Sequence, residues 1–106
     1  MPTVKELFER MPQAFDRAAA KDLTTVIEFD ITGEGGGQWY AAIDAGEIHV
    51  VEAAHEAPTL TISASAQDYL DISTGALNEQ LAFMTGRIRA KGNLLLAMKL
   101  PKIFKR

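Results

Sequence analysis

The sequence predicts a single α+β domain, in which helices cover one face of a mainly antiparallel, five-stranded sheet. Three observations predict this fold class. Apolar residues recur at helical spacing near both ends of the chain, they alternate with polar residues through the middle, and short turn motifs separate the alternating segments. The 106 residues form one domain, residues 1–106, because smaller pieces could not bury a useful core.

The first element is a helix that begins after Thr3. Thr3 and Glu6 have the spacing of a capping box, and apolar residues then recur at helical spacing as far as Ala19. Pro12 has no amide proton to donate, so we expect a kink or a restart there. The helical pattern stops near Lys21.

Four strands are expected next. Alternation with a period of two predicts them at residues 23–31, 38–44, 47–51 and 59–63, and the glycine-rich residues 33–37 form the first turn. Because the turns between successive strands are brief, the pattern favours an antiparallel meander.

Two short helices follow the fourth strand. Ser65 and Asp68 have a spacing like that of a capping box, and Gly75 is well placed to end the helix that they begin. Asn78 can cap a further short helix, which stops at Gly86.

The last two elements are a strand and an apolar helix. Residues 87–91 alternate cations with apolar side chains, which predicts a fifth strand that lies at an edge of the sheet or has one solvated face. Residues 94–100 form the final helix, which Pro101 is expected to break. This order of elements is typical of helices packed on one face of an antiparallel sheet.

The composition is that of an ordinary soluble globular protein, with 47% hydrophobic and 24% charged residues. The absence of cysteine excludes disulfides, thiolate metal sites and a cysteine nucleophile. No apolar run approaches the ~20 residues that span a bilayer, and the amino terminus shows no secretory signal. We therefore expect a cytoplasmic protein.

The net charge of −3 conceals a strong asymmetry. Residues 1–79 hold all 14 acidic residues and four basic ones, a net charge of −10, whereas residues 80–106 hold seven basic residues and no acidic one. A segment of one sign indicates an anionic partner. Nucleic acid is not expected as that partner, because the rest of the surface is acidic and no recognition motif is present.

No constellation of catalytic or metal-binding residues is recognisable. Residues 33–37 lack the following helix that a phosphate-binding loop requires, so they are interpreted as a hairpin turn. His49 and His55 lack the spacing of metal ligands and are expected to be solvated. Asp68 and Asp71 are interpreted as parts of a solvated helix face. The sequence therefore predicts no enzymatic activity, no cofactor and no metal.

Residues 94–98 are apolar around nearly the whole circumference of the predicted helix. Such a helix must be buried on several sides, line a cavity or meet a partner. Ordinary core filling is the simplest interpretation, while adaptable leucine and methionine side chains keep the cavity open as an alternative. The nearby basic residues can stabilise the carboxyl end of a helix, or they can face lipid headgroups or the phosphates of a coenzyme A thioester.

Several short motifs occur together in residues 75–100. They are a Gly-x-Leu-Asn turn, an Ala-Phe pair, a glycine before a basic-apolar strand, and a Gly-Asn pair before an apolar helix. This segment resembles the lipid-transfer domain of the sterol carrier protein type 2 family. Upstream, Trp39-Tyr40, Ala45-Gly46 and residues 61–63 are also similar to that domain, so the resemblance covers essentially the whole chain.

The resemblance implies a hydrophobic tunnel between the sheet and the helices, which binds fatty acids, fatty acyl-CoA, sterol-like molecules or phospholipids without changing them chemically. The residues carried over to the tunnel wall are Leu77, Leu81, Phe83, Met84, Ile88, Leu94, Leu95 and Met98. Weaker additions from the first helix and the first strand are Phe8, Phe15, Ile27 and Phe29. The chain lacks the longer tail of many eukaryotic members, which favours a stand-alone bacterial protein.

The sequence therefore predicts a non-catalytic lipid carrier. The residues expected to face headgroups or an anionic membrane surface are Arg87, Arg89, Lys91, Lys99, Lys102 and Lys105. The alternative is a scaffold or interaction module, such as an accessory factor for enzymes of lipid or quinone pathways, that uses the apolar helix for protein contacts. The sequence leaves the ligand and the oligomeric state open.

Overall fold

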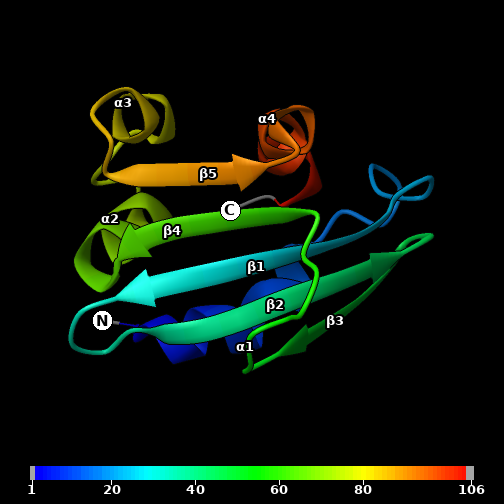
Figure 1. Ribbon diagram of the computed structural model, residues 1–106, viewed down its shortest axis with the longest axis horizontal. Coiled ribbons are helices and arrows are strands. Elements are labelled where there is room, and N and C mark those ends of the chain that lie inside the picture. The colour runs from blue at the N-terminus through cyan, green and yellow to red at the C-terminus, as the bar shows by residue number, and fades with distance from the viewer. Residues whose placement is uncertain (1, 105–106) are drawn as a thin grey trace.

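A mixed five-stranded sheet forms one layer of the protein, and four helices pack against it (Figure 1). The computed structural model describes residues 2–104. The elements are α1 (Val4–Ala14), β1 (Thr24–Thr32), β2 (Gly37–Asp44), β3 (Glu47–Val51), β4 (Leu60–Ser65), α2 (Ala66–Thr74), α3 (Glu79–Met84), β5 (Ile88–Gly92) and α4 (Leu94–Ile103). The predicted α+β class and the number of strands are confirmed.

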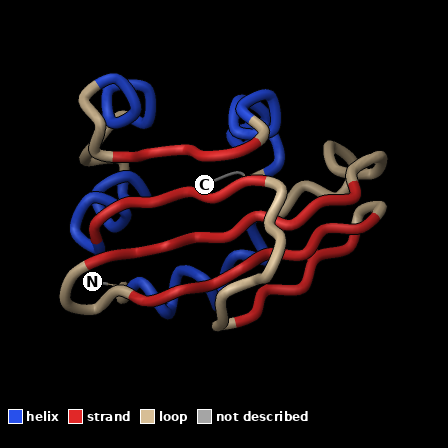
Figure 2. The backbone as a smooth tube through the Cα atoms, viewed as in Figure 1, coloured by secondary structure: helices blue, strands red, loops and turns tan. Residues whose placement is uncertain are grey.

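The strand order is β3-β2-β1-β4-β5, and the prediction of a four-stranded antiparallel meander is wrong at the fourth strand. β1 to β3 are antiparallel, with Phe29 opposite Trp39, but β4 runs parallel to β1, with Phe29 opposite Ile62. Residues 52–59 cross from β3 to the far side of β1 (Figure 2). Three strand spacings are about 14 Å, a distance that a loop of this length spans easily.

The crossing loop covers Glu28 of β1. Glu28 as a whole residue is only 7% exposed, and its Oε1 accepts a hydrogen bond of 2.7 Å from the amide of His55. The His55 ring lies 5.0 Å from that of Tyr40, and its Nδ1 accepts from the amide of Ala57. His49 is exposed as expected, whereas His55 is half-buried and organises the loop.

The first helix begins as predicted and ends earlier. Thr3 Oγ1 accepts from the amide of Glu6 at 3.1 Å, which confirms the capping box. α1 stops at Ala14, two residues after Pro12, instead of continuing to residue 19. The chain then forms a separate turn, in which the carboxylate of Asp16 accepts from the amide of Ala19.

The last helix passes through its proline. α4 extends to Ile103, so the prediction that Pro101 breaks it is wrong. A proline removes one backbone hydrogen bond, but the helical ladder resumes with a bond of 2.9 Å from the amide of Phe104 to the carbonyl of Leu100.

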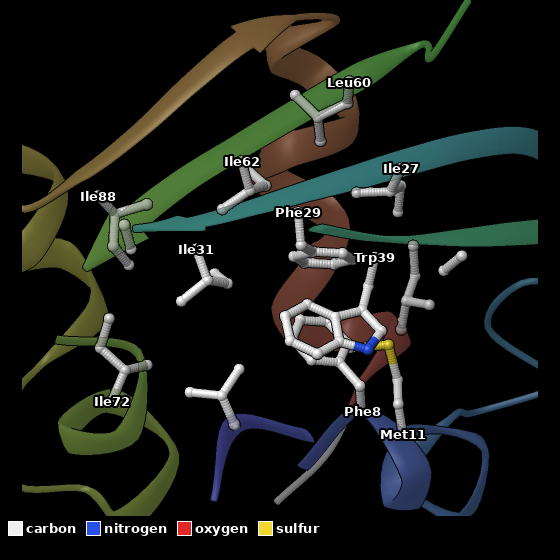
Figure 3. Close-up of a cluster of buried hydrophobic side chains, with 14 of the residues drawn as sticks. Phe8, Met11, Ile27, Phe29, Ile31, Trp39, Leu60, Ile62, Ile72 and Ile88 are labelled. Carbon is white, nitrogen blue, oxygen red and sulfur yellow. The ribbon is translucent and has the colours of Figure 1, made fainter. Parts of the chain in front are cut away.

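The core lies between the sheet and α1. Phe8 and Met11 of α1 pack against Ile27, Phe29 and Trp39, and all five side chains are buried (Figure 3). Because α1 covers the β1–β2–β3 part of the sheet, the space beside it, above β4 and β5, is left to the other helices.

Candidate functional site

A cavity of about 610 Å³ lies between the sheet and all four helices. Its floor consists of Phe29 from β1, Ile62 from β4 and Ile88 from β5, which all point to the core face (Figure 3). Cavities of 300–1,000 Å³ are typical of small-molecule sites, so this one is large enough for a ligand.

α1 carries two stripes of side chains, and one of them faces the cavity. Val4 and Phe8 are buried in the core, whereas Leu7, Arg10 and Ala14 line the cavity. Residues three and four apart lie on the same face of a helix. Met11, which is buried in the core, also lines the cavity, so α1 contacts both the core and the cavity.

The second and third helices form the opposite wall. Tyr69 and Ile72 of α2 and Phe83 of α3 line the cavity. Each helix is fixed at its start by a cap that the sequence predicted: Ser65 Oγ accepts from the amide of Asp68, and Asn78 caps α3 in the same way. These caps set where the two helices leave the sheet.

α4 closes the cavity on another side, through Ala97 and Leu100. Asn93 fixes its start twice: the Asn93 side chain accepts from the amide of Leu96 at 3.1 Å, and the Asn93 amide donates to the carbonyl of Thr59 at 3.0 Å. The Gly-Asn pair in the sequence therefore ties α4 to the beginning of β4.

The carboxyl-terminal end of α4 is joined to the end of α1. The amide of Asp16 donates to the carbonyl of Ile103 at 2.7 Å, and the rings of Phe15 and Phe104 lie 5.8 Å apart. Phe104 also lines the cavity. An aromatic pair thus closes the space between the first and last helices.

Within the described part of the chain the cavity wall is mainly apolar; its polar groups are the hydroxyl of Tyr69 and the side chains of Arg10, Gln13, Ser73 and Glu79. The Ser73 hydroxyl already donates to the carbonyl of Leu70 at 2.7 Å. Arg10 is exposed and lies 3.5 Å from the carboxylate of Glu6. An apolar wall with a few polar groups suits a ligand with a long apolar part and a polar head.

The structure brings together only some of the residues that the resemblance placed in a tunnel wall. Phe29, Phe83 and Ile88 line the cavity. Phe8, Phe15 and Ile27 are buried in the adjoining core, and Leu77 is half-buried against it. The exposed ones are Leu81, Met84, Leu94, Leu95 and Met98. Their role as ligand contacts stays a prediction.

The basic residues that were predicted to face headgroups and that the structure describes lie outside the cavity. Arg87, Arg89, Lys91, Lys99 and Lys102 are exposed, and none of them lines it. Lys105 lies outside the described residues.

Sequence reasoning missed Leu7, Arg10, Ile62, Ile72 and Leu100 as lining residues. A signal was present for the first two, because residues 7, 10 and 14 form a second stripe on the predicted helix. For Ile62, Ile72 and Leu100, the spacing of apolar residues in the sequence shows that the side chains face inward. It does not show whether they contact the core or line a cavity.

Within residues 2–104, no group of three or more acidic or histidine side chains could hold a metal ion. Nor does the same part of the chain contain a helix of the length and apolarity that a membrane span requires.

Comparisons with known proteins agree with the geometry. The family model described as the SCP-2 sterol transfer family matches residues 4–105. The solution structure of palmitated SCP2L2 from Aedes aegypti shares the fold, with a TM-score of 0.77, 24% identity and coverage of 95% of this chain and 93% of that one. Sterol carrier protein domain 2 of Helicoverpa armigera is 28% identical, with a TM-score of 0.62 over 93% of this chain and 71% of that one.

Among curated proteins, hydroxysteroid dehydrogenase-like protein 2 of Bos taurus is 31% identical over 102 residues. The match covers 94% of this chain but 24% of that protein, so the chain spans about a quarter of the length of this relative.

Proposed function

Because this chain belongs to the SCP-2 sterol transfer family, we propose that it binds the acyl chain of a fatty acid, or of a comparable lipid, in the cavity between the sheet and the four helices. The ligand leaves chemically unchanged. The observation that carries this proposal is the apolar cavity of about 610 Å³, with its floor of Phe29, Ile62 and Ile88. A palmitated protein with the same fold supports an acyl ligand.

The energetics favour a long chain. Transfer of the roughly fourteen methylenes of a palmitoyl chain from water gains about 11 kcal/mol. Association costs at least about 4 kcal/mol of this gain. The remaining free energy corresponds to a dissociation constant in the micromolar range. Shorter chains bury fewer methylenes, so we expect affinity to rise with chain length until the cavity is filled.

Arg10 is the group that we propose for the polar head. Among residues 2–104 it is the one cation that lines the cavity, and a guanidinium pairs well with a carboxylate or a phosphate. Its present partner, Glu6, is 3.5 Å away on the same exposed helix face, so an anionic head can compete for it. We place this binding function in the cytoplasm, where a chain without cysteine is unaffected by reducing conditions.

Native mass spectrometry of the freshly purified protein tests the proposal. We expect a bound mass that is lost on denaturation, is recovered in an organic extract and is restored by added palmitate. A protein that is empty and takes up neither palmitate nor palmitoyl-CoA contradicts it. That result would favour the alternative, a scaffold module whose exposed α4 residues Leu94, Leu95 and Met98 contact another protein.

A further inference from the structure

α3 and α4 carry large apolar side chains that point to solvent. They are Leu81, Phe83, Met84, Leu94, Leu95 and Met98, with exposed fractions from 42% for Phe83 to 81% for Met84. Within residues 2–104, the other exposed large apolar side chain is Val51. Exposed apolar residues that gather on a few elements indicate an interaction surface.

The two helices lie at the same side of the molecule. Both pack beside β5, which is the edge strand farthest from β3 (Figure 1). Phe83 and Leu100 show that the inner sides of both helices reach one cavity. Their outward apolar side chains therefore flank a single edge of the sheet.

Apart from the half-buried Glu79 at the start of α3, the charged residues at this edge are basic. Arg87, Arg89 and Lys91 lie in or beside β5, and Lys99 and Lys102 lie on α4. Residues 80–104 contain no acidic residue, whereas residues 1–79 have a net charge of −10. An anionic surface attracts residues 80–104 and repels residues 1–79. Such a surface therefore orients the protein with the β5 edge toward itself.

We propose that α3, β5 and α4 form a docking face for an anionic lipid bilayer. The six exposed apolar side chains enter the interfacial region, and the five cations remain at the level of the headgroups. Helices that bind at a membrane surface combine a buried apolar area with basic residues, and the proposed face has both. A protein partner would need a matching acidic and apolar patch, whereas a bilayer containing anionic lipid supplies both chemistries at once.

This face also explains how a lipid could reach the cavity, and in this respect the inference rests on the proposed function. Phe83 is both a cavity-lining residue and 42% exposed. On α4, Ala97 lines the cavity and the next residue, Met98, faces solvent. The walls of the cavity are thus the elements that meet the bilayer, so an acyl chain can pass between them without crossing bulk water.

The absence of cysteine makes the docking face easy to test. Met84→Cys and Met98→Cys, each labelled with the environment-sensitive dye NBD, report on α3 and α4. Glu34→Cys, in the exposed turn between β1 and β2, is the control. With phosphatidylcholine vesicles that contain phosphatidylserine, we expect the first two labels to shift to the blue and to brighten about two-fold or more, while the control stays unchanged.

Charge reversal tests the electrostatic part. Lys99→Glu with Lys102→Glu should lower co-sedimentation with the same vesicles about ten-fold or more at low salt. The matched control, Arg17→Glu with Lys21→Glu, makes the same change of net charge on an exposed turn beside Gly46 of the β2–β3 hairpin, and β3 is the edge strand opposite β5. Because only local charges act within a Debye length of the membrane, we expect the control to change binding by about two-fold or less.

Palmitate binding without vesicles separates the two proposals. A protein that binds palmitate, shows no difference between the three labelled positions and sediments equally well in both charge-reversed variants overturns the docking face alone. A protein that docks on vesicles but takes up no palmitate overturns the proposed function and leaves the docking face standing. Dimerisation that Leu95→Gln with Met98→Gln abolishes, without vesicle binding, would show that the face is a protein interface and would also overturn the inference.

Discussion

The ring of Phe8 lies against the indole of Trp39, with centroids 4.4 Å apart and 7° between the two planes. On another side of Phe8 is the ring of Tyr69, at 5.2 Å and 11°. One residue of α1 therefore joins the sheet to α2. Since Tyr69 lines the cavity and Trp39 is buried, this stack of rings connects the core to the wall of the candidate site.

Phe8→Ala should be one of the most destabilising single changes in the chain. Loss of a fully buried aromatic ring costs about 3–5 kcal/mol, and Phe8 is 1% exposed. Urea unfolding followed by the fluorescence of Trp39, the single tryptophan, measures the change. The same substitution at Phe83, which is largely outside the core, should cost about 1 kcal/mol or less. Equal losses in the two variants would contradict the assignment of the core.

Ala97→Trp should block the ligand while leaving the fold in place. The indole would occupy cavity volume that acyl methylenes otherwise fill, and each lost methylene costs about 0.8 kcal/mol. Displacement of about two methylenes or more lowers the affinity for palmitate about ten-fold. Met98→Trp, at the next position of the same helix but facing solvent, is the control and should bind nearly normally. Titration with palmitate, beside a thermal melt of each variant, distinguishes blockage from unfolding.

Arg10→Gln should weaken binding of palmitate and leave binding of hexadecanol unchanged. The difference arises because the alcohol has no charge for the guanidinium to pair with. Arg10 is exposed, so solvent screens the pairing and the loss should be about 0.5–1 kcal/mol, roughly two- to five-fold in affinity. Arg17→Gln removes a cation that does not line the cavity and serves as the control. An equal loss for acid and alcohol would mean that Arg10 does not receive the head.

Local patterns in the sequence were sufficient to predict most of the elements. Periods of 3.6 and 2 located the helices and strands, and the caps at Thr3, Ser65 and Asn78 are formed as expected. The direction of β4 was not predictable in this way, because alternation is the same in a parallel and an antiparallel strand. What decides it is the path of residues 52–59 across the sheet, which no local pattern encodes.

The candidate site was predicted less well than the fold. An all-round apolar helix can face a core, a cavity or a partner, and α4 divides its residues: Leu96 is buried, Ala97 lines the cavity, and Leu94, Leu95 and Met98 face solvent. Hydrophobicity does not distinguish these three environments. The position of the helix relative to β4 and β5 does, and that position depends on contacts distant in sequence.

Glu28→Ala should loosen the loop that crosses the sheet. The carboxylate accepts the His55 amide at 2.7 Å in a buried setting, and loss of a charged acceptor there costs about 2–3 kcal/mol. Glu28→Gln keeps an acceptor and should cost about half as much. Urea midpoints measure the stability, and limited proteolysis should show faster cleavage within residues 52–59 of the alanine variant. Identical cleavage of the two variants and the wild type would contradict the role of Glu28 as an anchor.

Gly92→Ala should displace α4 and with it one wall of the cavity. Gly92 has a φ of +113°, and a Cβ atom there would lie 2.4 Å from the carbonyl oxygen of Thr59. Relief of this clash requires the backbone to move, at an expected cost of about 2–4 kcal/mol. The movement must strain the neighbouring hydrogen bond that the Asn93 amide donates to the same Thr59 carbonyl. This hydrogen bond fixes the start of α4. We therefore expect lower stability in urea and weaker palmitate binding together.

Gly33→Ala separates this effect from the general strain of a positive φ. Gly33 has a φ of +85°, but a Cβ atom there would meet nothing within 4 Å. Its replacement should cost only about 1 kcal/mol, the penalty of the left-handed region, and it should leave palmitate affinity unchanged because the turn lies away from the cavity. If both variants lose stability equally and both keep their affinity, the contact between Gly92 and Thr59 does not position α4. If only Gly92→Ala loses affinity, the Gly-Asn pair is a determinant of the cavity and not merely of the turn.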